Sequence, residues 1–358
     1  MRKQIIFIIM AAILAVPFIA GCSDSDDNNH DNDTLIRAYF VNPAGAERVQ
    51  DEILDIIEST EKTLDICSYL FEDQSIATAT IAAKNRGVTV RVVCDDGNYD
   101  SYEAQYSRLE DAGIPVVHDN NSNNVHNKSL IADSTIIIGG CTNWTYSGIF
   151  LNNNSIVIVE SREIAAGYLE DFAQMYSGRF HSSKTSNGYE TATIGETTVT
   201  VRFTPQDNTE DLLRDQVQNA DESIEIAIYA LTLNYLTDDI IAAHNRGVDV
   251  KVIMDSLIVH GDDPWCSPAK YNELRSAGVD VRLDPCTYAF HHKFTIIDRN
   301  ATDKTVIVSS GNYSMGSTNY GSENFLVFTG GDIVDTYAAE FDRWWPDARV
   351  EEGGRLLN

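Results

Sequence analysis

Residues 81–95 read IAAKNRGVTVRVVCD, and residues 241–255 read IAAHNRGVDVKVIMD. Each stretch carries an apolar-periodic segment, an Asn-Arg-Gly turn, and a short apolar run that closes on aspartate. Glycine just after an apolar-periodic segment ends a helix, because it adopts the left-handed conformation at little cost. A short β-branched run favours a buried strand. A helix followed by a strand is therefore predicted twice, once in each half of the chain.

The sequence on both sides of this unit is repeated as well. Residues 40–71 parallel residues 203–231, each with an apolar-periodic helix before a short strand. Residues 109–119 parallel residues 274–284, each with a helix end, a glycine and a strand. Because repeated alternation of helices and strands builds one sheet per copy, we predict two pseudo-symmetric α/β sandwich domains. Each is expected to have a mostly parallel central sheet.

Shifts in composition mark the boundaries of the two copies. We predict a first repeat over residues 35–181 and a second over residues 194–347. The linker at residues 182–193 is where Ser, Thr, Asn, Gly and Lys replace the apolar periodicity. Residues 348–358 are expected to form a frayed C-terminal tail. With 358 residues, the chain is long enough for both copies to bury a core.

The N-terminus has the pattern of an export signal. Arg2 and Lys3 precede an apolar run over residues 5–20 that is short for a membrane span, which is typical of a signal peptide, here residues 1–21. The run ends in Ile-Ala-Gly-Cys, and this resembles the lipobox of bacterial lipoproteins, whose cysteine, here Cys22, is lipidated. An ordinary secretory signal followed by a chance cysteine is the alternative.

Residues 22–34 are expected to form a solvated acidic tether. The segment is rich in Asp, Asn and Ser, and residues 23–34 contain no apolar side chain that could bury surface. Together with the signal, the tether predicts a protein held at the bacterial cell envelope by an acyl anchor. In a Gram-negative cell this is the outer membrane or the periplasmic face.

The chain is strongly acidic, with 26 basic and 54 acidic side chains and a formal net charge of -28. Such a surface repels nucleic-acid backbones and anionic lipid over most of its area. A nucleic-acid partner is therefore disfavoured. Solubility alone also explains the acidity, since net charge says little about a local cleft.

Five cysteines remain after Cys22, and an exported protein meets oxidising conditions. Cys266 and Cys286 flank one loop-rich stretch and are the best candidates for a disulfide. Cys67 and Cys94 lie in apolar strand-like runs, where simple burial explains them. Spacing alone does not decide the pairing.

A His-x-Lys motif occurs at equivalent places in the two repeats. Residues 125–133 read VHNKSLIAD, and residues 290–298 read FHHKFTIID. Positions two apart on a strand face the same way, so the His and Lys of each copy are expected to project together into one cleft. The resulting candidates for the active site are His126, Lys128, Asp133, His291, Lys293 and Asp298.

A small-residue turn that ends in asparagine follows each motif, at residues 140–143 and 309–312. A phosphodiester transition state gathers negative charge on its nonbridging oxygens, which cationic and amide donors stabilise. The two lysines supply the charge, with Asn143 and Asn312 as neutral donors, so we expect neither a metal nor another cofactor.

These motifs resemble the signature of the phospholipase D superfamily, His-x-Lys-x4-Asp followed by Gly-Ser-x-Asn, over about residues 37–345. In that family two such halves meet about a pseudo-twofold axis, and both histidines approach one phosphate. The resemblance implies that one histidine attacks phosphorus to form a phosphohistidine while the other protonates the departing alcohol. Water or another alcohol then takes the phosphoryl group. Asp133 and Asp298 are expected to hold the lysines and strand ends in place.

One difference between the halves suggests how the two histidines divide the work. Glu323 aligns with Asn154. In the family, a downstream acidic residue of one half resembles an orienting partner for the nucleophilic histidine of the other half. The resemblance thus implies that Glu323 holds His126, the nucleophile, while Asn154 orients His291, the general acid. A slip of one position in this alignment would make Asn154 an ordinary loop residue.

Three further positions complete the expectations for the site. Cys141 stands where the family has serine and aligns with the candidate phosphate ligand Ser310, although a thiol is a poorer donor. His292 faces away from its neighbours and is expected to pack in the interior. The loop at residues 257–268 is expected to overhang the cleft and influence substrate choice.

The favoured hypothesis is a monomeric, membrane-tethered phosphodiesterase that cleaves the headgroup from phospholipid. A nuclease of the same superfamily is the alternative, and the acidic composition disfavours it. A binding lipoprotein with an inactive site is a third possibility, disfavoured because both His-x-Lys motifs are intact.

Overall fold

The computed structural model describes residues 35–357 apart from 42–45, 102, 187, 189, 262–265 and 353–354. The expected signal peptide, Cys22 and the acidic tether lie outside the described residues. Residues 35–358 form one compact unit. Within the described ranges, no helix has both the length and the apolar character that a membrane span requires.

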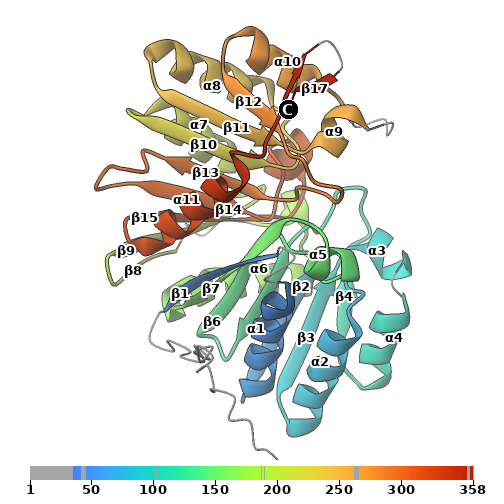
Figure 1. Ribbon diagram of the computed structural model, residues 1–358. Helices are drawn as coiled ribbons and strands as arrows, with labels where there is room; N and C mark the ends of the chain where they lie inside the picture. Colours follow the sequence, from blue (N-terminus) through green and yellow to red (C-terminus); the bar gives the residue numbers. More distant parts are fainter. Residues whose placement is uncertain are drawn as a thin grey trace, which may run out of the picture. The chain divides into compact units, whose positions relative to one another are not determined.

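The unit contains two large sheets, one in each lobe (Figure 1). In the first lobe the strand order is β1 (Ile36–Val41), β7 (Asn154–Glu160), β6 (Ile136–Gly140), β5 (Lys128–Ala132), β2 (Thr63–Ser68), β3 (Thr89–Cys94) and β4 (Val116–His118). In the second lobe it is β12 (Asp280–Leu283), β11 (Asp249–Met254), β10 (Ser223–Ile228), β13 (Lys293–Ile297), β14 (Thr305–Ser309), β15 (Asn324–Thr329), β9 (Thr197–Phe203) and β8 (Thr191–Ile194).

The helices follow the same repeated order. Those of the first lobe are α1 (Ala46–Ser59), α2 (Gln74–Arg86), α3 (Asp96–Ser101), α4 (Glu103–Asp111), α5 (Tyr146–Phe150) and α6 (Arg162–Tyr176), followed by a 3-10 turn, η1 (His181–Ser183). Those of the second are α7 (Thr209–Gln218), α8 (Asn234–Arg246), α9 (Ser256–His260), α10 (Ala269–Ser276), a π-helical turn, η2 (Gly316–Tyr320), and α11 (Asp332–Trp344).

The quoted repeat forms the predicted helix and strand in both lobes. Helix α2 ends at Gly87 with φ 102°, and α8 ends at Gly247 with φ 98°. Both glycines lie in the left-handed region that favours this residue. The chain then turns directly into β3 or β11, which pairs in parallel with β2 or β10.

The prediction of a mostly parallel sheet is wrong, because both sheets are mixed. Only β2, β3 and β4, and in the second lobe β10, β11 and β12, pair in parallel. The motif strands β5 and β13 pair antiparallel with β2 and β10. Short turns connect β5 to β6 and β13 to β14, and such turns join antiparallel neighbours.

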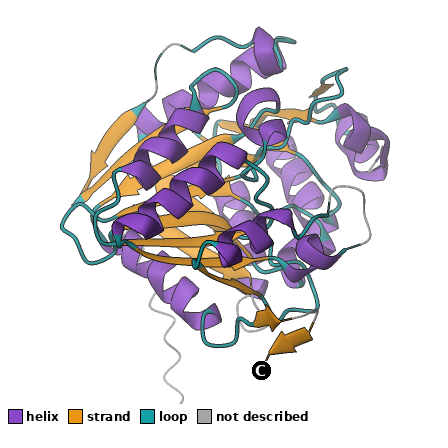
Figure 2. Ribbon diagram, turned by 90° about the horizontal axis from the view of Figure 1, so that it is seen from above, coloured by secondary structure: helices purple, strands orange, loops and turns teal. Residues whose placement is uncertain are grey.

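Helices α6 and α11 unite the two lobes. Helix α6 contacts β6 of the first sheet and β9 of the second, and α11 contacts β1 and β14. Their apolar side chains share one core with residues of both sheets. Helices α1 and α2 cover the outer side of the first sheet, and α7 and α8 cover that of the second (Figures 1 and 2). This shared core holds the two motif strands in a common frame.

Two segments differ from the expected boundaries. Strand β8 begins inside the predicted linker, because the β-branched residues at 191–194 pair with β9. The C-terminal tail forms a short antiparallel pair, β16 (Val350–Glu352) with β17 (Arg355–Leu357), instead of a frayed end. Arg349 also pairs with Leu283 of β12, which attaches this segment to the second lobe.

The cysteines of the described ranges are unpaired. All five cysteines within the described ranges are free, so no disulfide joins the candidate pair Cys266 and Cys286. Cys67 and Cys94 are buried, as their apolar surroundings predicted.

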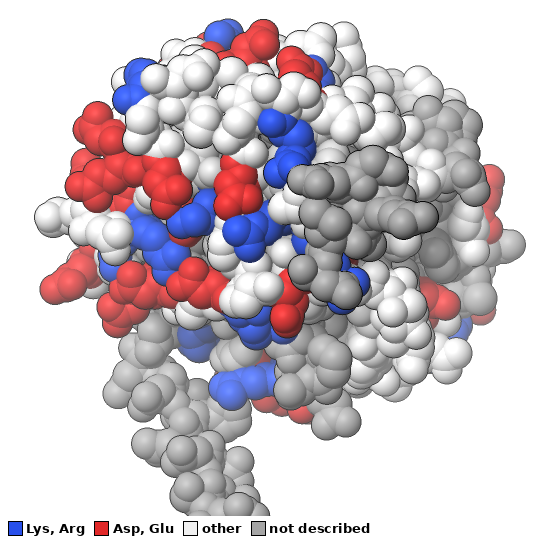
Figure 3. Space-filling model, turned by 45° about the horizontal axis from the view of Figure 1, so that its top comes forward, with Lys and Arg blue, Asp and Glu red and all other residues white. Residues whose placement is uncertain are grey.

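On the face shown in Figure 3, Lys and Arg side chains lie among Asp and Glu. The acidic excess is therefore interrupted by positive charge on this face.

Candidate active site

The residue just before each His-x-Lys motif forms a β-bridge to the opposite lobe. Val125 bridges to Ser322, and Phe290 bridges to Asn153. The amide of His126 donates to the Ser322 carbonyl at 2.9 Å, and the amide of Asn153 donates to a carbonyl beside Phe290, also at 2.9 Å. These reciprocal bridges make Ser322 equivalent to Asn153. Glu323 is therefore equivalent to Asn154, without a slip of one position.

A buried aspartate in each lobe accepts the backbone amide of the residue just before the motif. Asp95 Oδ2 accepts the amide of Val125 at 3.1 Å, and Asp255 Oδ2 accepts the amide of Phe290 at 2.6 Å. Burial, reinforced by the neighbouring Asp284, raises the pKa of Asp255 to about 7. Sequence reasoning assigned no role to either residue. Their signal was visible, since both aspartates close the quoted repeat.

His126 and Glu323 are in direct contact across the two lobes. Nδ1 of His126 lies 2.8 Å from Oε1 and 2.9 Å from Oε2 of Glu323, whose side chain is 1% exposed. Burial raises the pKa of Glu323, but His126, Lys128 and Ser310 outweigh burial and hold that pKa below its usual value. A carboxylate only accepts hydrogen bonds, so Nδ1 carries the proton and Nε2 keeps its lone pair.

Burial also governs the charge of His126 itself. It lowers the pKa of the imidazole to about 4, although Glu323 opposes the shift. The ring is therefore neutral at neutral pH. A neutral ring with its lone pair at Nε2 has the form that a nucleophile requires.

The space for Glu323 depends on a glycine opposite it. A Cβ atom at Gly311 would lie 2.9 Å from Cδ of Glu323. In the first lobe Thr142 occupies the equivalent position and donates to Oδ1 of Asn154 at 2.6 Å. Asn154 in turn donates to the Gly148 carbonyl at 3.0 Å. The expectation that Asn154 orients His291 is wrong, because its amide is hydrogen-bonded within its own lobe.

Ser310 donates a hydrogen bond to Glu323 and positions its carboxylate. Its hydroxyl donates to Oε2 of Glu323 at 2.7 Å and accepts the amide of Asn324 at 3.0 Å. A serine has one O–H to donate, so the predicted contact with phosphate is replaced by a contact that positions the carboxylate. Cys141, at the equivalent place, is buried with Sγ 3.7 Å from the Ser155 carbonyl oxygen.

The two lysines are each 1% exposed and lie beside their histidines. Nζ of Lys128 donates to the His126 carbonyl, and Nζ of Lys293 lies 2.9 Å from Nε2 of His291. Burial lowers the pKa of Lys128 to about 7 and that of Lys293 to about 8. An entering anion would favour the charged form of both groups.

A tyrosine accompanies each pair. The Tyr69 ring is 4.4 Å from that of His126 and 4.7 Å from Nζ of Lys128. Tyr229 repeats this arrangement in the second lobe, with its ring 4.7 Å from that of His291. An aromatic face attracts a nearby cation. Sequence reasoning missed both tyrosines, although they follow equivalent strands of the repeat.

His291 shows that the groups of the two lobes share one site. Burial holds the pKa of its imidazole well below the usual range, and the nearby charges of Lys293, Lys128 and His126 lower it further. Lys128 and His126 belong to the opposite lobe. An imidazole with this pKa is neutral until an anion between the lysines offsets their charge.

The two asparagines of the small-residue turns each have an unpaired side-chain oxygen. Oδ1 of Asn143 and Oδ1 of Asn312 are both buried without a hydrogen-bond partner in the described part of the chain. Asn143 is 8% exposed. These oxygens can only accept a hydrogen bond, so the expected donation from the two amides to phosphate stays a prediction.

The aspartates of the two motifs, Asp133 and Asp298, bind backbone amides at strand ends. Asp133 accepts the amides of Glu61, Lys62 and Thr63 at 2.9, 2.6 and 3.0 Å. Burial raises its pKa, but these donors outweigh burial and hold the pKa below the usual value. Asp298 accepts three equivalent amides at the start of β10. Both aspartates hold strand ends, and neither pairs with its lysine in these contacts.

A cleft of about 220 Å³ opens beside His126. Its wall combines a loop of the first lobe with the π-helical turn of the second. The lining residues are Ser122, Asn123, Asn124, His126, Asn312, Ser314, Gly316, Ser317, Gly321 and Glu323. Hydroxyl and amide groups therefore dominate the approach to the His126 side of the site.

Other predicted residues have structural surroundings. His292 is fully buried, and its Nε2 lies 3.1 Å from Oε1 of Glu340, so the expected packing role is correct. In the described part of the loop at residues 257–268, Leu257 is 47% exposed, and the expected overhang of the cleft stays a prediction. The remainder of that loop includes residues 262–265, which lie outside the described ranges.

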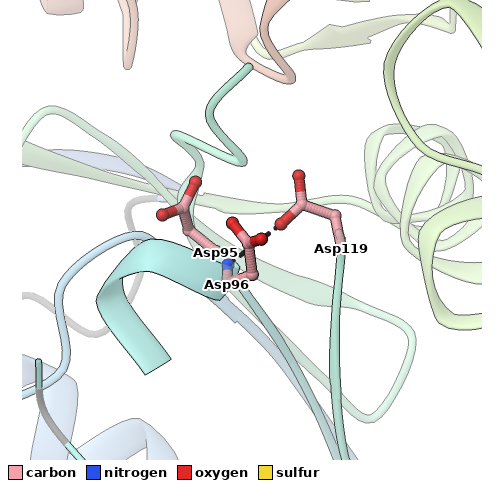
Figure 4. A group of neighbouring side chains, drawn as sticks. All are labelled: Asp95, Asp96 and Asp119. Carbon is pink, nitrogen blue, oxygen red and sulfur yellow. Dashed lines mark hydrogen bonds between the residues drawn. The ribbon is translucent and has the colours of Figure 1, made fainter. Parts of the chain in front are cut away.

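One acidic group among the described residues could hold a metal by proximity alone. Asp95, Asp96 and Asp119 offer oxygens within 4.8 Å of one another (Figure 4). Asp119 Oδ1 accepts the amide of Asp96 at 3.0 Å, and its Oδ2 lies 2.6 Å from Nε2 of His181. Asp95 holds Val125, as described above. Since these oxygens already have partners, we assign the group a structural role.

Comparison with known proteins adds a family likeness. The family model described as "Cardiolipin synthase, PLD-like domain" matches residues 53–176 and 213–345. A mitochondrial cardiolipin hydrolase of Xenopus tropicalis is 30% identical over 124 residues, which span 35% of this chain and 59% of that protein. A phospholipase D of Rickettsia prowazekii is 32% identical over 137 residues, 38% of this chain and 65% of that protein. The matches thus cover less than two thirds of either relative.

A solved structure resembles nearly the whole unit. The phosphatidylserine synthase of Haemophilus influenzae has a TM-score of 0.68 and 12% sequence identity, and the match covers 90% of this chain and 87% of that one. At this identity the likeness shows the fold alone.

Proposed function

Because the chain belongs to the family of phospholipase D-like domains of the cardiolipin synthase type, we propose that it is a phosphodiesterase that hydrolyses phospholipid headgroup esters through a covalent phosphohistidine. The observation that carries the proposal is the contact between His126 and Glu323, at 2.8 Å, beside two buried lysines. It presents a neutral imidazole with an oriented lone pair to a site built for an anion.

In the first step, Nε2 of His126 attacks phosphorus, and the bond from phosphorus to the headgroup oxygen breaks. His291 donates a proton to that oxygen as it leaves. Lys128 and Lys293 stabilise the negative charge on the nonbridging oxygens. The phosphorylated ring of His126 is cationic with Nδ1 still protonated, and the carboxylate of Glu323 balances that charge.

The second step reverses the proton transfers. His291, now neutral, accepts a proton from water, and the water oxygen attacks phosphorus. The bond from phosphorus to Nε2 of His126 breaks and restores the free enzyme. His291 regains its proton for the next cycle from that water, so protons and electron pairs balance over the two steps.

Three observations favour lipid as the diester. Two relatives are named for cardiolipin hydrolysis and phospholipase D activity, although each is matched over less than two thirds of its length. The acidic composition disfavours nucleic acid. The N-terminal signal pattern and Cys22 would attach the enzyme to the cell envelope, where phospholipid is the nearest abundant diester.

A substrate panel with the full chain tests this proposal. Headgroup release from phosphatidylcholine and phosphatidylethanolamine vesicles is measured beside cleavage of single- and double-stranded DNA, all with a chelator present. We expect headgroup release that the chelator does not abolish. Cleavage of DNA without release from any lipid would contradict the proposal and identify a nuclease.

A further inference from the structure

The cleft beside His126 lies on one side of the reaction. It contacts His126 and Glu323, and its lining does not include His291 or Lys293. In an in-line displacement, the nucleophile and the leaving alcohol occupy opposite faces of phosphorus. The headgroup that departs next to His291 is therefore directed away from the cleft. The retained alcohol lies in the plane between the nucleophile and the leaving group, so it is the substituent that can extend into a cleft beside His126.

We propose that this cleft binds the glycerol backbone and ester carbonyls of the retained diacylglycerol. The inference rests on the proposed function and names the part of the substrate that each side of the site takes. In headgroup hydrolysis, the group retained on His126 is the phosphatidyl group. Its first atoms beyond the phosphate are a glycerol carbon chain and two ester groups.

The lining matches the chemistry of those ester groups. Ester carbonyl oxygens accept hydrogen bonds, and the side chains of Ser122, Asn123, Asn124 and Ser314 carry hydroxyl and amide donors. The carboxylate in the lining, Glu323, is already paired with His126 and Ser310. The lining contains no lysine or arginine, so a second phosphate group would find no cation there.

Two exposed apolar residues are next to lining residues of the cleft in the chain. Met315 lies between two lining residues and is 43% exposed, and Tyr320 precedes the lining residue Gly321 and is 52% exposed. They stand at the two ends of the π-helical turn. Such turns are rare and concentrate at functional sites. In the proposed complex the polar lining contacts the glycerol and ester groups, and these neighbouring apolar side chains, here called the rim, contact the acyl chains.

The first lobe builds the equivalent segment differently. It forms an ordinary α-helix, α5, in which Ile149 is buried. In the second lobe the corresponding residues, Gly-Ser-Thr-Asn-Tyr, are polar or small and form the π-helical turn. This difference gives the nucleophilic side its own lining, as expected if the two sides of the site take chemically different parts of one substrate.

The first test compares ester-linked and ether-linked phosphatidylcholine with the same chain lengths, using the full chain and mixed micelles. Ether lipids keep the headgroup and chains but lack the carbonyl acceptors. A site that hydrogen-bonds a group discriminates against the analogue without it. We expect the ester lipid to be hydrolysed at least tenfold faster, and Asn123→Ala with Asn124→Ala to reduce that preference.

The second test concerns the rim. In Met315→Ser with Tyr320→Ser, the ratio of the rate on long-chain vesicles to the rate on bis(4-nitrophenyl) phosphate is expected to fall at least fivefold. Leu35→Ser is the control, because Leu35 is similarly exposed at 46% and, unlike Met315 and Tyr320, is not next to any lining residue in the chain. It should leave the ratio unchanged.

The outcomes separate the two proposals. Hydrolysis of ester and ether lipids at equal rates would overturn the subsite and leave the proposed function standing. An unchanged ratio in the rim double variant would also overturn it. Failure to cleave either lipid, with bis(4-nitrophenyl) phosphate still cleaved, would overturn the proposed function and the subsite together.

Discussion

Gly311 and Glu323 fit together so closely that a Cβ atom at residue 311 would lie 2.9 Å from the Glu323 carboxyl carbon. In the first lobe the equivalent pair is Thr142 and Asn154, joined by a hydrogen bond of 2.6 Å. Each lobe thus combines a turn residue with a matching partner. The combination in the second lobe leaves room for a carboxylate that reaches His126.

Gly311→Ala is expected to displace Glu323 and lower kcat by about 10-fold or more, because a misplaced group near the chemistry is costly. Steady-state kinetics on bis(4-nitrophenyl) phosphate measure the effect. Thr142→Ala is the matched control. It removes a hydrogen bond worth about 1 kcal/mol of stability but should retain most turnover. Equal losses of kcat in the two variants would contradict the special role of the second lobe.

Glu323→Gln keeps the shape of the side chain and removes its charge. The amide cannot balance the cationic phosphohistidine, so we expect kcat to fall by roughly 10²- to 10⁴-fold, as in other sites where a carboxylate orients a histidine. Asn154→Ala, at the equivalent position of the other lobe, should lower kcat far less. If Asn154→Ala proved the more damaging change, the roles of the two lobes would be reversed.

The activity should depend on pH through groups in both motifs. His126, with a pKa of about 4, must be neutral to attack, so kcat/KM is expected to rise as pH increases through that value. Lys128, with a pKa of about 7, and Lys293, with a pKa of about 8, must be charged. The rate should therefore fall as pH rises above the lowered pKa of His291, which must be protonated to act as the acid, and fall again as the lysines lose their charge between about 7 and 8. A profile that stays flat to pH 9 would contradict this assignment of charges.

Asp298 is predicted to support stability instead of chemistry. Its carboxylate accepts three amides, and its φ of 49° lies in the left-handed region. Asp298→Ala should lower the free energy of unfolding by about 2 to 3 kcal/mol through unsatisfied donors and backbone strain. Denaturant titration measures this, with Asp298→Asn as the milder control. A normal unfolding curve with abolished turnover would instead place Asp298 in the reaction.

The repeat and the motifs were predictable because they are local. The helix ends at Gly87 and Gly247 and the spacing of His126 and Lys128 follow from neighbouring residues. The order of strands depends on contacts between distant segments, and the expectation of mostly parallel sheets failed there. The same limit explains why Tyr69 was missed, since its contact with His126 is visible only after folding.

The roles of Ser310 and Asn154 show the same limit inside the site. Each belongs to the motif pattern, yet its hydrogen bonds depend on the residue across the turn. Ser310 meets a carboxylate and donates to it, while Asn154 meets Thr142 and remains within its lobe. A family signature indicates which residue types gather at a site. The direction of each hydrogen bond comes from packing.

The most direct test of the central claim is to trap the covalent intermediate. The full chain is mixed with a labelled short-chain phosphatidyl ester of 4-nitrophenol, whose leaving group needs no general acid, and quenched, and the modified peptide is identified by mass spectrometry. We predict a phosphatidyl adduct on His126 that accumulates in His291→Asn and is absent from His126→Asn. An adduct on His291 that persists in His126→Asn would contradict the account.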